Sequence, residues 1–296
     1  MTINNNFKIS VIICTLRRPE YLKRCLGSLI VQNFPPHEII VVYASDDHIT
    51  EKLLKEYNVI SVQQKELKGL SNARNLGINA ASGHIIAFID DDAIADKNWL
   101  KHLICGYNDE CIGGVGGIVY SPDGKFMNFS NGYVDSSGNV YNDNEIYKNT
   151  EKLFPYLIGC NCSFKKEVLL SIGGFNEYYK YMYDETDLCV RIIRKGYKIV
   201  HVNNAIVFHA FEGQKDMWFH LSKNRTYFLI KNFNPELPLL KIISRDLSNL
   251  YEDVRSNIKF KRRKIYFNNI YHIFLGYCFG ISDSYIKNEE LLQFEH

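Results

Sequence analysis

Short apolar runs alternate with segments of helical periodicity over the first 90 residues. The runs are rich in Ile and Val, which is typical of buried strands in a parallel sheet, and they lie at residues 8–14, 38–43, 59–62 and 85–89. Helices are expected between them at residues 19–31, 49–57 and 71–81, with Pro19 early in the first and Ser71 as N-cap of the third. This alternation predicts an α/β fold with a mostly parallel, doubly wound sheet.

The pattern changes after residue 92. A Gly-rich strand is expected at 112–120. Residues 126–152 are rich in Asn, Ser, Asp, Gly and Tyr, which predicts either a long surface excursion or irregular hairpins. Further helices are predicted at 99–107, 168–172 and 187–195, late strands at 198–202 and 205–208, and mainly helix from Trp218 onward.

Composition narrows the class of protein. The chain has 296 residues, a net charge of +2 and ordinary apolar and charged fractions, which excludes disordered and fibrous classes and gives no support to nucleic-acid binding. The eight cysteines are scattered, as in a reduced cytosolic protein. Residues 1–7 are polar and no stretch of 18 apolar residues occurs, so we expect neither a cleavable signal nor a membrane span.

The apolar run at 85–89 ends in three carboxylates, Asp90, Asp91 and Asp92. Side chains alternate along a strand, so Asp90 and Asp92 are predicted to point the same way and Asp91 the other. Ligands of open α/β sheets bind at the carboxyl ends of strands, and paired carboxylates suit Mg²⁺ or Mn²⁺. The alternative is a solvated acidic turn.

Other motifs that would define an enzyme class are missing. The glycines at 113–117 lack GxGxxG spacing and do not open a helix, and the chain contains no phosphate loop, HExxH zinc motif or GxSxG elbow. Dinucleotide-binding, P-loop, zinc-peptidase and α/β-hydrolase functions therefore lose their support.

Six segments in order resemble the bacterial family 2 glycosyltransferases of the GT-A fold. They are residues 10–15 (SVIICT), 69–77 (GLSNARNLG), 88–92 (FIDDD), 159–161 (GCN), 173–177 (GGFNE) and 184–188 (DETDL). The resemblance implies a GT-A catalytic domain over residues 1–230 and a helical extension over 231–296. Within the catalytic domain it implies a nucleotide-sugar-binding half at 8–100 and an acceptor-binding half at 101–230.

The same resemblance assigns the metal and donor contacts. It implies a nucleoside-diphosphate sugar as donor and Asp90 with Asp92 as the DxD motif holding Mn²⁺ or Mg²⁺, Asp92 being the direct ligand. Asp90 is expected to contact ribose or metal-bound water as well, Asp91 to lie on the donor side, and His209, which ends a late strand, to contact metal or phosphate. The alternative for His209 is a structural histidine.

The resemblance also assigns the catalytic base. Segment 184–188 matches the ED motif of the family, so Glu185 is expected to accept the proton of the acceptor hydroxyl in an inverting displacement, with Asp184 as the second choice. Asn161 and Asp187 are placed on the acceptor side, with Asp187 mainly a helix cap or support. Acids at this position would also stabilise the N-terminus of the following helix in the absence of any catalytic role.

The resemblance implies donor contacts for Thr15 and Arg74, the alternative for Arg74 being a helix-surface ion pair. Arg17 and Arg18 follow the first strand, which places both as candidates to face the diphosphate. One position departs from the family pattern, because Tyr43 stands where relatives carry an Asp that reads uracil. A tyrosine can stack on a base or sugar but cannot accept two hydrogen bonds as a carboxylate does. The donor nucleotide is therefore left open.

A basic stretch at 255–264 precedes aromatic residues at helical spacing, and together they make residues 255–286 a candidate for contact with an anionic membrane surface. The alternative is packing on the catalytic domain or on a second subunit in a homodimer. The resulting hypothesis is a cytoplasmic, metal-dependent inverting glycosyltransferase, placed at the inner face of the cell membrane. Its acceptor would be a glycan or lipid-linked saccharide of cell-surface polysaccharide synthesis. The alternatives are a nucleotidyltransferase and a non-catalytic nucleotide-sugar-binding protein.

Overall fold

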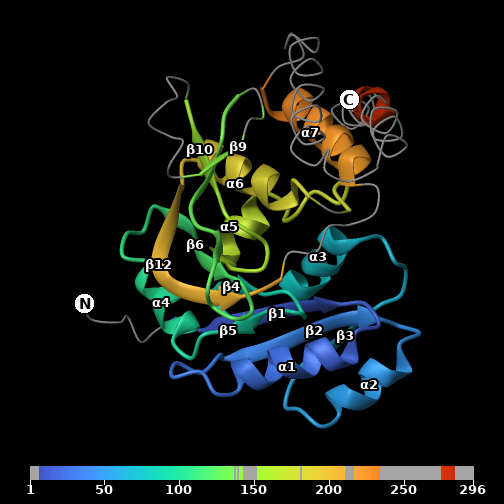
Figure 1. Ribbon diagram of the computed structural model, residues 1–296, viewed down its shortest axis with the longest axis vertical. Helices are drawn as coiled ribbons and strands as arrows, with labels where there is room; N and C mark the ends of the chain where they lie inside the picture. The colour runs from blue at the N-terminus through green and yellow to red at the C-terminus, as the bar shows by residue number, and fades with distance from the viewer. Residues whose placement is uncertain are drawn as a thin grey trace. The chain divides into compact units, whose positions relative to one another are not determined.

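The computed structural model describes residues 7–136, 138, 140–142, 152–180, 182–210, 217–233 and 275–283 (Figure 1). The chain forms two compact units. The larger unit comprises Met1–Val134 and Val140–Phe211, and the smaller comprises Asp135–Asn139 and Glu212–His296. All the residues of the site described below belong to the larger unit.

The first half of the larger unit is a parallel sheet with helices on both faces (Figure 1). Its strands are β1 (Ile9–Thr15), β2 (Glu38–Ala44), β3 (Ile60–Gln64) and β4 (Ile85–Phe88), in the order β3-β2-β1-β4. Its helices are α1 (Pro19–Leu29), α2 (His48–Leu54) and α3 (Leu70–Ala80). The predicted doubly wound arrangement is confirmed.

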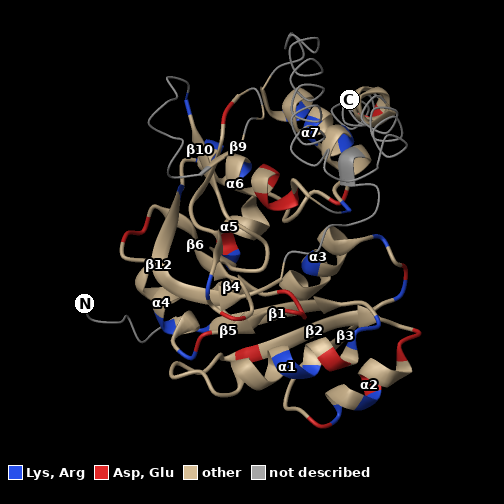
Figure 2. Ribbon diagram, in the orientation of Figure 1, with Lys and Arg blue, Asp and Glu red and all other residues tan. Residues whose placement is uncertain are grey.

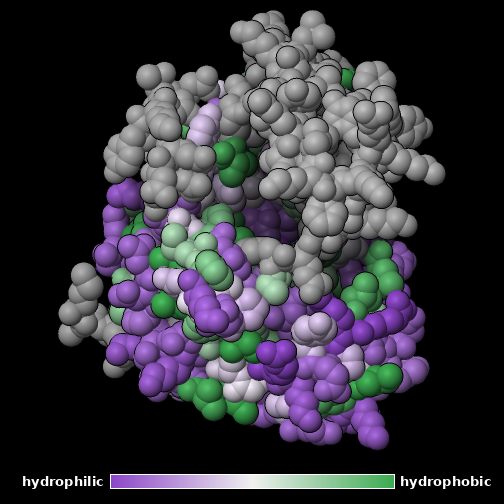
Figure 3. Space-filling model, viewed as in Figure 1, coloured by the Kyte–Doolittle hydropathy of each residue, from purple (hydrophilic) through white to green (hydrophobic). Residues whose placement is uncertain are grey.

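Strand alternation divides the interior into two cores. Val11 and Ile13 of β1 face a core that contains the apolar side of α1, whereas Ile12 faces a core that contains Ala73 and Ile78 of α3. Because both faces of β1 are covered, the strand is apolar almost throughout, as parallel sheets require. Among the residues coloured in Figure 3, the surface on this face is mainly hydrophilic, with apolar residues in separate patches.

The second half extends the sheet with antiparallel neighbours. The full order is β3-β2-β1-β4-β11-β6-β12-β5, with β7 beside β6. β11 is antiparallel to both β4 and β6, whereas β12 is parallel to β6. A separate three-stranded sheet has the order β10-β8-β9. The strands are β5 (Ile94–Ala95), β6 (Ile112–Tyr120), β7 (Met127–Phe129), β8 (Gly132–Val134), β9 (Val140–Asn142), β10 (Phe154–Tyr156), β11 (Cys162–Lys165) and β12 (Lys198–Phe208).

Three predicted boundaries are wrong. The two late strands are one strand, β12, whose register with β6 shifts between His201 and Ile206. The cap of α3 is Gly69, at φ 102°, because the hydroxyl of Ser71 donates to the Tyr179 carbonyl instead. The last predicted helix of this unit begins three residues early, at Asp184. The remaining helices of the larger unit are α4 (Trp99–Cys105), α5 (Lys166–Ser171) and α6 (Asp184–Arg194).

The smaller unit contains α7 (Met217–Phe233) and a helical segment at 275–283. Lys223 pairs with Asp283 at 2.9 Å, and the rings of Phe219 and Phe279 are in edge contact. Within the described segments, no helix combines the length and apolar character that a membrane crossing requires. Most of the predicted membrane-contact segment, residues 255–286, lies outside the described residues.

Candidate active site

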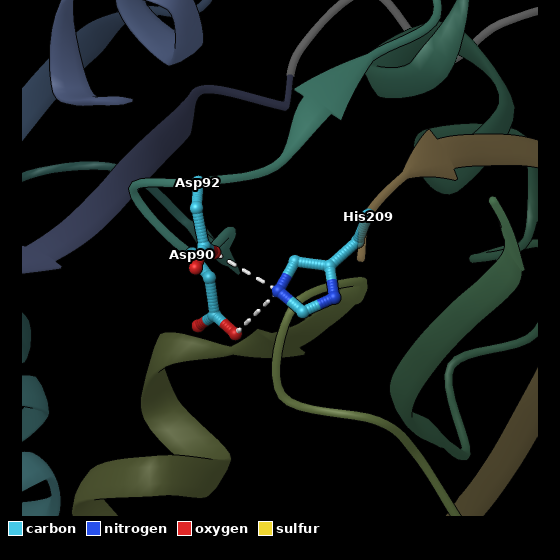
Figure 4. A group of neighbouring side chains, drawn as sticks. All are labelled: Asp90, Asp92 and His209. Carbon is cyan, nitrogen blue, oxygen red and sulfur yellow. Dashed lines mark hydrogen bonds and ion pairs between the residues drawn. The ribbon is translucent and has the colours of Figure 1, made fainter. Parts of the chain in front are cut away.

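Two carboxylates and an imidazole converge at one edge of the large sheet. Asp90, Asp92 and His209 each offer a ligand atom, and these atoms all lie within 4.8 Å of one another. His209 Nε2 is 2.9 Å from an Asp92 oxygen and 3.9 Å from an Asp90 oxygen (Figure 4). A set of two carboxylates and one imidazole fits a divalent cation such as Mn²⁺ or Mg²⁺.

Strand pairing explains how residues so far apart in sequence meet. The aspartates follow β4 directly, and β5 begins two residues after Asp92. Ile94 of β5 is paired with Phe208, the last residue of β12. His209 follows Phe208 and therefore lies beside the aspartates. The side chains of Asp90 and Asp92 both point toward the histidine (Figure 4), so they share a direction as predicted, although they lie in the turn that follows β4.

Asp91 points the other way and is fully buried. Thr15, at the carboxyl end of β1, donates to Asp91 at 2.6 Å, and Arg18 donates to it from Nε at 3.1 Å. Burial raises the pKa of Asp91 to about 6, although Thr15 and Arg18 oppose the shift. Arg18 also donates to Asp92 at 2.8 Å, so one guanidinium joins two members of the acidic triplet.

The metal-capable groups influence one another's ionisation. Burial opposes the charge on Asp92, but the hydrogen bond and charge of His209 outweigh burial and hold the Asp92 pKa below its ordinary value. Burial alone would lower the pKa of His209, yet Asp92 and Asp90 raise it. Burial raises the pKa of Asp90 against the opposing charges of Arg74 and His209. Negative charge at this point thus depends on neighbouring cations.

Arg74 lies at the centre of a second cluster. Its side chain is only 3% exposed, and it donates to Asp184 at 2.5 Å and to Glu185 at 2.8 Å. It also lies 3.7 Å from Asp90, which links this cluster to the metal-capable group. The acidic residues at the start of α6 are red in Figure 2. The structure therefore brings together Asp90, Asp92, His209, Arg74, Asp184 and Glu185.

The two acids beside Arg74 differ in protonation. Burial and the neighbouring Glu185 carboxylate raise the pKa of Asp184 well above its ordinary value. Burial also acts against ionisation of Glu185, but the Arg74 guanidinium lowers its pKa below the ordinary value. The pKa of Asp184 is thus shifted upward and that of Glu185 downward, while Arg74 donates to both carboxyl groups. Two carboxylates in contact commonly separate in this way.

The backbone around this cluster has little freedom. Gly159 has no side chain where a Cβ would collide with the Glu185 carboxylate and the Arg74 guanidinium. Met182 and Tyr183 have φ of 63° and 67°, a left-handed conformation that costs about 1–3 kcal/mol per residue outside glycine. This conformation precedes α6 directly and sets the direction from which Asp184 and Glu185 enter the site.

The structure places four other predicted site residues as follows. Arg17 pairs with Asp46 at 2.6 Å on the surface, and Tyr43 is 4% exposed within the core on the α1 side. Asn161 and Asp187 are fully buried. The donor contacts expected of Arg17 and Tyr43 and the acceptor-side placement of Asn161 and Asp187 stay predictions.

The two buried residues have structural partners. Asn161 accepts from the Trp99 indole at 2.8 Å and donates to the carbonyls of Ile118 and Ala205, both at 2.9 Å. Asp187 accepts from Arg191 at 2.7 Å, one turn further along α6. Asp187 thus has the supporting position that was expected of it as the alternative to an acceptor contact.

Sequence reasoning gave little weight to three residues that the structure places at the site. Arg18 was treated as equivalent to Arg17, but only Arg18 reaches the acidic triplet. Gly159 and Phe175 were recognised only as parts of motifs, whereas the Phe175 ring lies 5.2 Å from the Arg74 guanidinium carbon. A glycine or phenylalanine in a short motif gives no signal of which side chain it will contact.

The fold of the chain is the GT-A fold that its structural neighbours share. Residues 10–173 match the family model described as Glycosyl transferase family 2. The chain therefore belongs to the family 2 glycosyltransferases, as the resemblance of its motifs predicted.

Two relatives show how far the sequence similarity extends. A glucosyl-dolichyl phosphate glucuronosyltransferase of Haloferax volcanii is 27% identical over 284 residues, covering 83% of this chain and 88% of the relative. Glycosyltransferase GlyA of Streptococcus pneumoniae serotype 4 is 33% identical over 101 residues, covering 32% of this chain but only 14% of GlyA. Similarity thus extends over most of the chain in one case and is confined to about a third of it in the other.

Solved structures share the fold at low sequence identity. GalNAc-T7 with UDP, GalNAc and Mn²⁺ has a TM-score of 0.60 at 19% identity, covering 77% of this chain and 48% of that one. The mannosyltransferase PcManGT from Pyrobaculum calidifontis, in complex with GDP-Man and Mn²⁺, has a TM-score of 0.57 at 15% identity, covering 94% and 74%. This chain thus spans about half of GalNAc-T7 and most of PcManGT.

Proposed function

We propose that this chain transfers a sugar from a nucleoside-diphosphate sugar to a hydroxyl group of a glycan or lipid-linked saccharide, with inversion at the anomeric carbon. The observation that carries the proposal is the link between two clusters. The metal-capable group and the carboxylate pair of α6 meet through Arg74, which lies 3.7 Å from Asp90 and 2.8 Å from Glu185. A leaving diphosphate and an attacking hydroxyl need such neighbouring sites.

Asp92, Asp90 and His209 are proposed to hold Mn²⁺ or Mg²⁺. When bound, the cation would neutralise charge on the departing diphosphate and act as a Lewis acid. The donor set fits this task because its three ligand atoms lie within 4.8 Å of one another at the edge of the sheet where α/β folds bind ligands. Arg18 is the residue that orients Asp92, since it occupies the carboxylate oxygen that does not face His209.

Glu185 is proposed as the general base. As the acceptor oxygen forms its bond to the anomeric carbon and the bond to the diphosphate breaks, the hydroxyl proton passes to the Glu185 carboxylate. The ionised state this requires is favoured by Arg74, which lowers the Glu185 pKa. Asp184, whose pKa is raised, is proposed to support Glu185 through Arg74, which donates to both carboxyl groups. Thr15 donates to Asp91 and so fixes the middle residue of the acidic triplet.

The acceptor, the domain roles and the cellular site are also proposals. The Haloferax volcanii relative is named for a sugar on a lipid phosphate, which supports a lipid-linked acceptor and a role in surface polysaccharide synthesis. We propose residues 1–230 as the catalytic domain and 231–296 as an extension. Residues 255–286 would contact the inner membrane face of the cell, where such an acceptor lies.

The test is a screen of donors. Thermal stabilisation by UDP-, GDP-, dTDP- and CMP-sugars, each with and without Mn²⁺, should single out one nucleotide in a metal-dependent manner, and the same donor should be hydrolysed slowly without acceptor. Metal-independent binding that Asp92→Asn does not weaken would contradict the metal assignment. Release of pyrophosphate from a nucleoside triphosphate would support a nucleotidyltransferase, and binding without turnover a non-catalytic protein.

A further inference from the structure

We infer that Asn75 is a positioning residue, which holds the turn at 172–175 so that Phe175 fixes Arg74 against Glu185. Asn75 lies on α3, one residue after Arg74, and touches neither the metal-capable group nor the carboxylates of α6. The inference deepens the proposed function and rests on it. Asn75 acts on the proposed base, Glu185, through two other residues, Phe175 and Arg74.

The side-chain amide of Asn75 hydrogen-bonds to both backbone polar groups of Phe175, its carbonyl and its N–H. Its side-chain nitrogen donates to the Phe175 carbonyl at 2.9 Å, and its side-chain oxygen accepts from the Phe175 N–H at 2.8 Å. The preceding residue, Gly174, has φ 70°, and a Cβ there would lie 2.6 Å from the Asn75 oxygen. The turn therefore lies directly on the Asn75 amide, and a side chain at 174 would separate them.

The Phe175 ring carries this constraint to Arg74. The ring is 2% exposed, lies in edge contact with Phe88 at 5.3 Å between centroids, and has the Arg74 guanidinium carbon 5.2 Å from its centre. Phe88 lies 5.8 Å from the same carbon. Two rings thus hold the guanidinium against Glu185 and Asp184. If Phe175 moved, the contact that fixes the Glu185 carboxylate would move with it.

The same turn is held from α6. Arg191 donates to the carbonyl of Ile172 and to that of Gly174, both at 2.9 Å, and pairs with Asp187 at 2.7 Å. The turn therefore joins the helix that carries Arg74 to the helix that carries Asp184 and Glu185. Asn75 supplies the α3 side of this junction, and it makes a paired hydrogen bond rather than a single one.

Asn72 provides a matched control on the same helix. It also has an asparagine side chain and, like Asn75, donates to Glu177 at 3.0 Å. Its other bond comes from Gln64 at 2.9 Å, and none of its hydrogen bonds reaches the turn at 172–175. Any general effect of losing an asparagine from α3 should therefore be the same for Asn72→Ala and Asn75→Ala.

The experiment measures transfer kinetics in both variants with the donor identified by the screen. A displacement of about 1 Å at a reacting group costs up to about a hundredfold in rate, so kcat of Asn75→Ala should fall about ten- to a hundredfold. Its donor KM should change less than kcat, because Arg74 donates directly to Asp184 and Glu185 and lies farther, at 3.7 Å, from Asp90 of the metal-capable group. Asn72→Ala should keep kcat within about twofold. Equal kcat in the two variants would overturn the inference.

Phe175→Leu decides the matter if Asn75→Ala does not fold. It keeps both backbone bonds with Asn75 and removes the ring beside Arg74, so a fall in kcat of similar size is expected. Wild-type kcat in Phe175→Leu would contradict the route through the ring.

A readout without turnover separates this inference from the proposed function. In arginine-labelled protein, the Nε–H resonance of Arg74, identified with Arg74→Lys, should shift or broaden in Asn75→Ala and stay in place in Asn72→Ala. Failure of the wild-type protein to transfer any sugar would count against the proposed function alone. An Arg74 resonance that is the same in both asparagine variants would count against the role of Asn75 alone.

Discussion

Replacing Arg74 by methionine is expected to leave the buried Glu185 carboxylate without its cation. Methionine keeps much of the volume of the arginine stem, so the change removes charge rather than packing. Arg74 is 3% exposed and Glu185 is 17% exposed, and their atoms lie 2.8 Å apart. Removing one partner of a buried pair costs about 3–5 kcal/mol, which we expect as the loss of unfolding free energy at pH 7.

The loss of unfolding free energy in Arg74→Met should become smaller as the pH falls. In the wild-type protein, Arg74 lowers the Glu185 pKa, so this carboxylate contributes stability above its unfolded pKa. Without Arg74, burial raises the folded pKa above the unfolded one, so the folded variant binds more protons than the unfolded chain. Its unfolding free energy then decreases as the pH rises, by at most about 1.4 kcal/mol per pH unit for one proton. The difference in unfolding free energy between the wild type and Arg74→Met should therefore be about 2 kcal/mol smaller at pH 5 than at pH 7.

Urea unfolding in EDTA provides the assay. A Trp218→Phe background makes Trp99, which is fully buried in the larger unit, the fluorescent reporter. Arg24→Met is the matched control, because Arg24 is exposed on α1 and its replacement should change stability by less than about 0.5 kcal/mol. A loss below about 1 kcal/mol for Arg74→Met, or an equal loss at both pH values, would refute the reasoning.

Three further predictions concern the site and its support. Gly159→Ala should lower kcat by more than about a hundredfold, since its methyl group would collide with Glu185 and Arg74, whereas Gly27→Ala, with nothing within 4 Å, should leave kcat unchanged. In the pH profile of kcat/KM, the apparent pKa on the acid side should lie below the ordinary glutamate value of 4.5 in the wild type and rise in Arg74→Lys. An apparent pKa that is the same in both proteins would exclude Glu185 as the titrating group. Asn161→Ala should lose about 2–4 kcal/mol of unfolding free energy while kcat/KM changes less than about threefold, and a large kinetic loss in a stable variant would favour the acceptor-side role of Asn161 instead.

Periodicity and strand ends were enough to predict the first half of the fold. The parallel strands are apolar on both faces. Asp90 and Asp92 point the same way as predicted, although they lie in the turn after β4 rather than in the strand. The resemblance of the motifs added Arg74, Glu185 and His209, which the structure brings to one edge of the sheet.

What the sequence did not reveal is set by tertiary contacts. Tyr43 lies within β2, where strand alternation turns its side chain into the core on the α1 side. Asn161 lies in a motif but bonds to Trp99 and two carbonyls, partners that local sequence does not reveal. Ser71 has the residue type of a cap, yet its hydroxyl bonds to the Tyr179 carbonyl. Long-range hydrogen bonds thus override local preferences at each of these positions.

The central claim is tested most directly by comparing wild type, Asp92→Asn and Glu185→Gln in one transfer assay, with donor binding measured in parallel. The account predicts Mn²⁺-dependent transfer in the wild type and weakened metal-dependent donor binding in Asp92→Asn. In Glu185→Gln it predicts retained donor binding and loss of transfer. Full transfer by Glu185→Gln, or donor binding that neither Mn²⁺ nor Asp92→Asn affects, would contradict it.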